Sequence, residues 1–200
     1  MTARAVLIVV DVQLDFCPGG SLAVPGGDTI IPVINRYMEL FRARALPVVA
    51  TRDWHPPVTG HFRPFGGLWP PHCVQGTPGA RFHPDLRLPD DVIVVSKGTD
   101  PHRDDYSPFH AVMASGLTFS EYLQQSGTAH LFICGLATDY CVRETALDGL
   151  KAGFRVTVLT DAVKGVNLHP GDSSRALEEI AAAGGEFADL TSLGNVLSGI

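Results

Sequence analysis

Hydrophobic and polar positions follow two alternating patterns along the chain: short continuous apolar runs, and longer segments with an apolar residue every three or four positions. A continuous apolar run of strand length is typical of a parallel strand that is buried on both faces. The runs predict five such strands and one edge strand, at residues 6–12, 47–51, 92–96, 130–135, 155–161 and 186–190.

The segments with helical spacing lie between these strands. They predict helices over residues 28–44, 119–125, 141–153 and 172–183, with Asp28 and either Asp172 or Ser173 as caps. Strands that alternate with helices predict an α/β fold of three layers, α/β/α, with a mostly parallel, Rossmann-like central sheet of about six strands. No repeat or linker divides the sequence, so residues 1–200 are expected to form a single domain.

Residues 52–89 differ from the rest of the chain. They are rich in Pro, Gly, His and aromatic residues, and neither the strand nor the helix period is sustained. Irregular segments of this length inside a compact domain usually carry function. We therefore expect the 52–89 segment to be ordered and to contribute to a binding or catalytic site.

Composition narrows the class of protein. With 45% hydrophobic and 18% charged residues the chain is expected to fold, and no apolar run reaches the roughly 20 residues of a membrane-spanning helix. A net charge of −6 without a basic cluster argues against nucleic acid as a partner. The N-terminal apolar run is too short for a signal peptide, so we expect a cytoplasmic protein. Four cysteines do not form a disulfide scaffold and are read as thiols.

Three reactive side chains follow three predicted strands. Asp11 closes the first strand, Lys97 follows the third, and Cys141 follows the fourth at the start of a helix. The carboxyl ends of parallel strands meet at one edge of the sheet, where ligands collect. A cysteine at a helix N-terminus, a carboxylate that takes its proton and a stabilising ammonium form a set suited to acyl transfer. Each residue alone could instead be a turn cap, a surface charge or a buried apolar side chain.

The 52–89 segment contains a second group of polar residues, Asp53, His55, His61 and His72. Carboxylate and imidazole are ligands for zinc, iron or manganese, and alternation along an extended segment points residues 53 and 55 to the same side. Eight histidines in 200 residues will include chance neighbours, so spacing alone leaves a metal site open.

Five stretches together resemble the cysteine hydrolase family that includes nicotinamidases, pyrazinamidases and isochorismatases. They occur in the family's order and span most of the domain: VVDVQLDF at 9–16, TRDWHPPVTGHF at 51–62, WPPHCVQGTPGA at 69–80, SKG at 96–98 and GLATDYCV at 135–142. The resemblance implies the isochorismatase-like α/β fold. It favours the nicotinamidase branch, because isochorismatase-type relatives usually lack the metal-bearing stretch.

The resemblance also implies roles. Cys141 is expected to be the nucleophile, Asp11 the proton acceptor and donor, and Lys97 the cation that supports both. The resemblance further implies one divalent ion, zinc, iron or manganese, with ligands Asp53, His55, His72 and, at a variable fourth position, His61.

Around the nucleophile the family has a non-proline cis peptide, which would fall between residues 137 and 138 here. The backbone amides of Ala137 and Cys141 are expected to form an oxyanion hole. Substrate contacts are expected from Phe16, Trp69, Tyr106, Ala137 and Thr138. Tyr140 departs from the histidine that relatives often have at this position.

The resemblance implies hydrolysis of nicotinamide, and of pyrazinamide, to nicotinic acid and ammonia through a cysteine thioester, in NAD salvage. An alternative is a related cysteine amidohydrolase that acts on another small amide, N-carbamoyl or ureido compound. A further alternative is a non-catalytic metal-binding module of the same fold. The expected partner is a small-molecule substrate, and the sequence leaves a homo-oligomer open.

Overall fold

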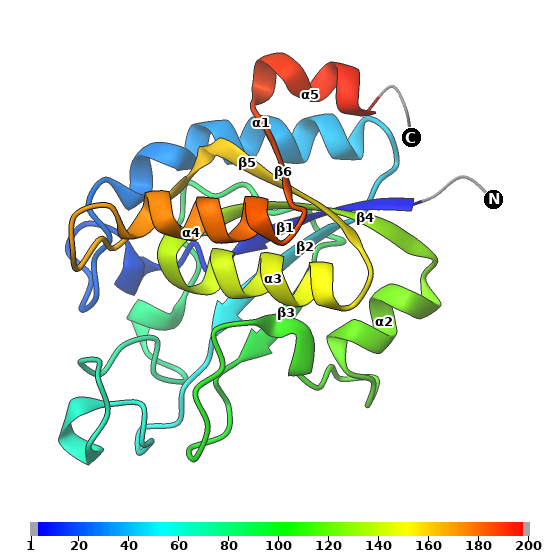
Figure 1. Cartoon of the computed structure of the whole chain (residues 1–200). Helices are drawn as coiled ribbons and strands as arrows, with labels where there is room; N and C mark the ends of the chain where they lie inside the picture. The colour runs from blue at the N-terminus through cyan, green and yellow to red at the C-terminus, as the bar shows by residue number, and fades with distance from the viewer. Residues whose placement is uncertain (1–3, 198–200) are drawn as a thin grey trace.

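The structure is a computed structural model that describes residues 4–197. Six strands form one sheet in the order β3-β2-β1-β4-β5-β6, and every neighbouring pair is parallel. The predicted α/β fold with a six-stranded sheet is thereby confirmed (Figure 1). The strands are β1 (Arg4–Val10), β2 (Val48–Asp53), β3 (Ile93–Lys97), β4 (Thr128–Leu136), β5 (Arg155–Lys164) and β6 (Glu186–Ala188).

The strand order contains a topological switch between β1 and β4. The chain builds outward from β1 to β3 on one side and then crosses back to continue from β4 to β6 on the other. Loops after β1 and β4 therefore leave in opposite directions, which opens a crevice at their carboxyl ends. The residues that follow these two strands are therefore expected to line a binding site.

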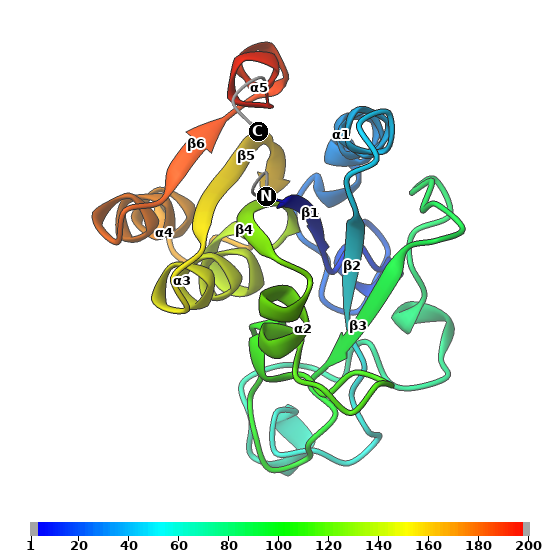
Figure 2. The ribbon, with the colours of Figure 1, turned by 90° about the vertical axis from the view of Figure 1, so that its right-hand side faces the viewer.

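Two helical layers cover the sheet (Figure 2). Helices α1 (Ile31–Arg42) and α5 (Leu190–Leu197) lie on one face, whereas α2 (Phe119–Gln125), α3 (Arg143–Lys151) and α4 (Asp172–Ala182) lie on the other.

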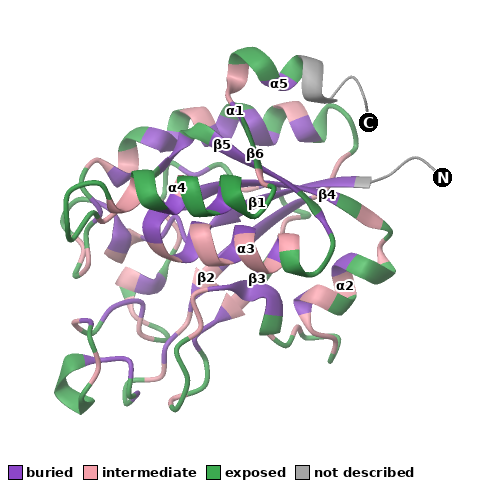
Figure 3. Cartoon of the chain, in the orientation of Figure 1, coloured by how far each residue is buried: buried purple, intermediate pink, exposed green. Residues whose placement is uncertain are grey.

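Strand β1 divides the core in two because its side chains alternate between the faces of the sheet. Its odd-numbered residues from Ala5 to Val9 pack with α1, and its even-numbered residues from Val6 to Val10 pack with α2, α3 and α4. All six are buried, as the continuous apolar run predicts. Figure 3 shows the same arrangement, with a buried sheet and exposed outer helix faces.

Several predicted bounds are wrong. The helix predicted from residue 28 begins at Ile31, because a short 3-10 turn (Gly27–Ile30) contains Asp28. The helix predicted from 141 begins at Arg143, after a π turn (Thr138–Val142) that holds Cys141. Gly171, with a φ of 86°, caps α4 in place of Asp172 or Ser173. Helix α5 is not among the predicted elements.

The 52–89 segment is ordered and lies over the carboxyl ends of β1, β2 and β3 (Figures 1 and 2). Beyond the end of β2 it contains only isolated bridges and two short 3-10 turns, Arg63–Phe65 and Pro78–Ala80. Backbone hydrogen bonds hold it in place: the Leu14 amide donates to the Arg81 carbonyl at 2.9 Å, and the His83 amide to the Val12 carbonyl at 2.9 Å. These hydrogen bonds hold the segment against the loop that follows β1.

None of the helices within residues 4–197 combines the length and the apolar character that crossing a bilayer requires.

Candidate active site

The structure brings Asp11, Lys97 and Cys141 together. The Lys97 ammonium lies 2.8 Å from Oδ2 of Asp11 and donates to Sγ of Cys141 at 3.2 Å. Strand β2 separates β3 from β1, so neighbouring strands about 4.8 Å apart place Lys97 roughly 10 Å from Asp11 along the sheet. A lysine side chain is long enough to cross most of that gap. All three residues are buried.

Burial and charged neighbours together shift the pKa values of Asp11, Lys97 and Cys141. Burial raises the pKa of the Cys141 thiol well above its ordinary value, against the opposing effect of Lys97. Burial also raises the pKa of Asp11, although Lys97 works in the other direction. For Lys97, burial favours the neutral amine, yet the carboxylates of Asp11 and Asp53 outweigh it and hold the pKa well above the ordinary value. These directions favour a protonated Cys141 thiol beside the Lys97 ammonium, and they make Asp11 a stronger base than an ordinary carboxylate.

Thr51 fixes the Asp11 carboxylate. Its hydroxyl donates to Oδ1 of Asp11 at 2.6 Å, and its carbonyl accepts from the Asp11 amide at 3.2 Å. Oδ2 of Asp11 is thereby directed toward Lys97. The sequence pattern offers no sign of this role, because Thr51 looks like any other β-branched residue of a buried strand.

Asp53 and the three histidines of the 52–89 segment form a second cluster beside the first. Oδ2 of Asp53 lies 3.6 Å from Nε2 of His55 and 3.8 Å from Nε2 of His72. One ring nitrogen from each of His55, His61 and His72 lies within 4.8 Å of the others, and all of these residues are buried. A buried carboxylate and imidazoles gathered in this way form a donor set that suits a divalent metal ion.

The hydrogen bonds of the imidazoles support that interpretation. Each ring has an oxygen acceptor at Nδ1: for His55, His61 and His72 these are the Gly98 carbonyl at 3.0 Å, Asp104 Oδ1 at 2.5 Å and the Pro70 carbonyl at 2.8 Å. Donation from Nδ1 leaves Nε2 with its lone pair, the tautomer that binds metals. Nε2 of His55 is buried and has no hydrogen-bond partner within the described part of the chain. An orphaned lone pair of this kind fits a bound metal ion.

Lys97 joins the two clusters. Besides Asp11 and Cys141, its ammonium contacts Oδ1 of Asp53, with which it is also in register across β2 and β3. Burial alone raises the pKa of Asp53, but Lys97 together with His55 and His72 outweighs it, and the pKa lies well below the ordinary value. The Asp53 carboxylate therefore faces the histidines with one oxygen and the Lys97 ammonium with the other.

The side chain of Gln13 holds the main chain of Asp53 in place. Its Nε2 donates to the Asp53 carbonyl at 2.8 Å, its Oε1 accepts from the Asp53 amide at 2.8 Å, and Nε2 also donates to the Ala80 carbonyl at 3.0 Å. Gln13 is fully buried. It was not among the predicted site residues, because nothing in the local pattern distinguishes it from a loop residue.

Replacement of Gln13 with leucine is expected to destabilise the fold by about 2–6 kcal/mol, since it leaves the buried amide and carbonyl of Asp53 unpaired at about 1–3 kcal/mol each. Urea unfolding measures the loss. Gln75 is a matched control, because its side-chain amide also donates to a backbone carbonyl, that of Trp54, but is exposed. An equal effect of Gln13→Leu and Gln75→Leu would contradict this account.

A narrow pocket opens onto both clusters. Of the residues predicted to contact substrate, four line it: Phe16, Trp69, Tyr106 and Ala137. Thr138, also predicted, is buried and is not part of the pocket wall, because its turn directs other residues to the opening. The wall is completed by residues that were not predicted as contacts, namely Leu22, Tyr140 and Val166, together with Asp53, His61, His72 and Cys141.

Aromatic contacts brace this pocket. The Trp69 indole donates to the Tyr106 hydroxyl at 2.9 Å and meets the Tyr140 ring edge-on at 5.0 Å between centroids. On the other side, the Phe16 ring lies 5.4 Å from that of His72. Aromatic side chains in mutual contact therefore form apolar parts of the wall beside the polar clusters.

The cis peptide joins Leu136 to Ala137, one residue earlier than predicted. Strand β4 continues through Leu136, so the turn that carries Cys141 begins at Ala137. Inside the turn, the amides of Tyr140 and Val142 donate to the Ala137 carbonyl at 3.1 and 3.0 Å. These bonds hold Cys141 at the junction with α3.

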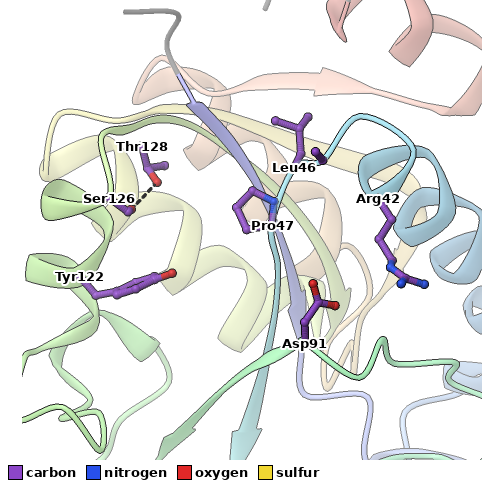
Figure 4. Close-up of a pocket in the computed structure, with 8 residues that line it drawn as sticks. Arg42, Leu46, Pro47, Asp91, Tyr122, Ser126 and Thr128 are labelled. Carbon is purple, nitrogen blue, oxygen red and sulfur yellow. Dashed lines mark hydrogen bonds between the residues drawn. The ribbon is translucent and has the colours of Figure 1, made fainter.

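Another hollow, of about 450 Å³, lies at the amino ends of the strands (Figure 4). Its lining includes Arg42, Pro47, Asp91 and Tyr122, and the Ser126 and Thr128 hydroxyls bond to each other at 3.0 Å. No histidine or cysteine is among the residues that line it. The Asp11–Lys97–Cys141 group and the histidine cluster lie instead at the carboxyl ends of the strands.

Comparison with known proteins agrees with the geometry. The isochorismatase domain family model matches residues 5–192. The nicotinamidase of Escherichia coli strain K12 is 40% identical over 200 residues, covering 92% of this chain and 93% of that protein.

Solved structures of similar proteins have the same fold. The pyrazinamidase of Pyrococcus horikoshii in complex with zinc is 48% identical with a TM-score of 0.86, covering 94% of this chain and 99% of that one. PnC1 from L. infantum in complex with nicotinate is 36% identical with a TM-score of 0.85, covering 96% of each chain.

Proposed function

The chain belongs to the isochorismatase domain family, and from that premise we propose that it is a nicotinamidase, which hydrolyses nicotinamide to nicotinic acid and ammonia. One observation carries the proposal. The buried Lys97 ammonium contacts Asp11, Cys141 and Asp53 at once, so that a nucleophile set and a metal-ligand set meet at one pocket. In this role the enzyme returns nicotinic acid to NAD salvage.

The pocket suits a flat heteroaromatic amide. Phe16 and Trp69 offer apolar ring faces, and Cys141 together with His61 and His72 supplies polar groups at the same wall. Pyrazinamide has the same shape and the same carboxamide, so we expect it to be hydrolysed as well.

The first chemical step is formation of a thioester on Cys141. Asp11 accepts the thiol proton while the sulfur attacks the carboxamide carbon, and the Lys97 ammonium offsets the negative charge that passes between them. The oxyanion accepts hydrogen bonds from the backbone amides of Ala137 and Cys141. Collapse breaks the carbon–nitrogen bond, and the proton held by Asp11 passes to the nitrogen, which leaves as ammonia.

The second step regenerates the cysteine. Asp11, again a carboxylate, takes a proton from water, and the resulting hydroxide attacks the thioester carbon. The carbon–sulfur bond breaks, the sulfur regains the proton from Asp11, and nicotinic acid leaves. The same carboxylate therefore acts twice as base and twice as acid, which its fixation by Thr51 permits.

Asp53, His55, His72 and His61 would hold one divalent ion, zinc, iron or manganese. When bound, the ion supplies a positive charge that orients the ring nitrogen of the substrate.

Ammonia release over a panel of amides tests the proposal. We expect nicotinamide and pyrazinamide to be hydrolysed with a kcat/KM at least about 10²-fold above that for N-carbamoyl or ureido compounds, because only the aromatic amides fill the ring-lined pocket. Preference for an N-carbamoyl compound would favour the related amidohydrolase instead. Hydrolysis of none of them, by protein that has bound metal, would favour a non-catalytic module.

A further inference from the structure

We propose that Asp104 is a positioning residue for the metal centre, which holds His61 in the tautomer and orientation that present Nε2 to the ion. The inference rests on the proposed function, because it concerns the ligands of the same site. Oδ1 of Asp104 lies 2.5 Å from Nδ1 of His61. A carboxylate that accepts a hydrogen bond from Nδ1 leaves the lone pair on Nε2 and makes that nitrogen a stronger electron-pair donor to a metal ion.

His61 differs from the other two imidazoles in the nature of this partner. His55 and His72 donate to the backbone carbonyls of Gly98 and Pro70, which are neutral and which no side-chain substitution removes. His61 alone of the three donates to a charged side chain. Its tautomer is therefore set by a residue that can vary without changing the fold.

Exposure separates the two partners of this pair. The His61 side chain is 5% exposed, whereas the Asp104 side chain is 58% exposed. A hydrogen bond whose carboxylate acceptor is exposed to this extent contributes only about 1 kcal/mol to stability. A role in stability alone therefore gives little reason for a carboxylate at this position, whereas a role in directing a buried ligand does.

The main chain keeps the loop of Asp104 in place independently of the carboxylate. The Gly60 amide donates to the Pro101 carbonyl at 2.9 Å, and the Thr59 hydroxyl donates to the same carbonyl at 3.2 Å. The Thr59 hydroxyl also accepts from the His61 amide at 3.3 Å. Removal of the Asp104 carboxylate should consequently release the imidazole of His61 without releasing the loop.

The first test measures zinc affinity by competition with a chelator. We expect Asp104→Ala to weaken zinc binding by roughly 10–100-fold, the range found when a partner of a metal-bound histidine is removed. Asp104→Asn should have a smaller effect, because its side-chain oxygen still accepts a hydrogen bond but lacks the charge. Asp105→Asn is the matched control: Asp105 is the adjacent carboxylate and pairs with Arg103 at 2.9 Å rather than with a ligand.

The second test reads the tautomer in metal-free protein by ¹⁵N NMR of the histidine rings. The wild type is expected to carry the His61 proton on Nδ1, and Asp104→Ala to shift it toward Nε2. Asp105→Asn, the control named above, should leave the His61 proton on Nδ1, because Asp105 pairs with Arg103. A purely structural role of Asp104 predicts a lower melting temperature with the tautomer unchanged.

Two results would overturn the inference: zinc affinity of Asp104→Ala equal to that of the wild type, or an unchanged Nδ1 proton in that variant. Both measurements are independent of amide hydrolysis. If the wild type failed to hydrolyse nicotinamide while Asp104→Ala lost zinc affinity, the proposed function would fall and the role of Asp104 would stand. If the wild type hydrolysed nicotinamide and Asp104→Ala kept its zinc affinity, the proposed function would stand and the role of Asp104 would fall.

Discussion

Replacing Cys141 with alanine is expected to lower the turnover of nicotinamide by at least about 10⁴-fold, because no other group at the site can form the thioester. Lys97 remains paired with Asp11 and Asp53 in this variant, so no buried charge loses its counter-ion. The variant should therefore fold, with a free energy of unfolding within about 1 kcal/mol of the wild type. Ammonia release and urea unfolding measure the two quantities.

Cys134 is the matched control for loss of a sulfur atom. It is a buried cysteine within β4, and its thiol faces the Ile8 carbonyl at 3.7 Å rather than the pocket. Cys134→Ala should retain turnover. Turnover above a few per cent in Cys141→Ala would remove Cys141 from the role of nucleophile.

Replacing Lys97 with methionine is expected to reduce both activity and stability. The ammonium lies between the carboxylates of Asp11 and Asp53 in a fully buried environment, and removal of one partner from a buried ionic group typically costs about 3–5 kcal/mol. The same change removes the charge that supports proton transfer from Cys141, so turnover should fall by about 10²–10³-fold or more. Urea unfolding and ammonia release provide the measurements.

A second substitution separates the two effects. Asp11→Asn in the Lys97→Met background removes one of the stranded carboxylates and should restore part of the stability, while activity stays low because the base is lost. Lys151→Met, at an exposed lysine near the end of α3, should leave stability within about 0.5 kcal/mol of the wild type. Wild-type turnover in Lys97→Met would show that the ammonium plays no part in catalysis.

The gathering of Asp11, Lys97 and Cys141 could be predicted because they occupy positions with a general meaning in this fold. Asp11, Lys97 and Cys141 follow strands, and parallel strands bring their carboxyl ends to a common edge. The Asp53 and His55 pair lies where β2 ends, and the motif order supplied the rest. The bounds of the helices were predicted less well, because local turns such as the one that contains Asp28 replace the expected cap.

The supporting residues could not be predicted in this way. Gln13, Thr51 and Asp104 act through hydrogen bonds to groups that are 40 or more positions away in the chain. Hydrophobic periodicity reports which side of an element is buried, but it contains no information on which polar group meets which. Periodicity likewise could not show that Thr138 is buried and lies outside the pocket wall.

The amino-acid sequence by itself determined the order of the strands and of helices α1 to α4, the sheet class and which polar side chains follow the strands, because these follow from local periodicity and from residue type. Only the tertiary structure decided that Lys97 extends past β2 to contact Asp11, Cys141 and Asp53 together. That contact depends on the order of strands in the sheet and on the distance between them. The same contact sets the pKa values at the site, because burial and the charged neighbours together shift the pKa of each ionisable group.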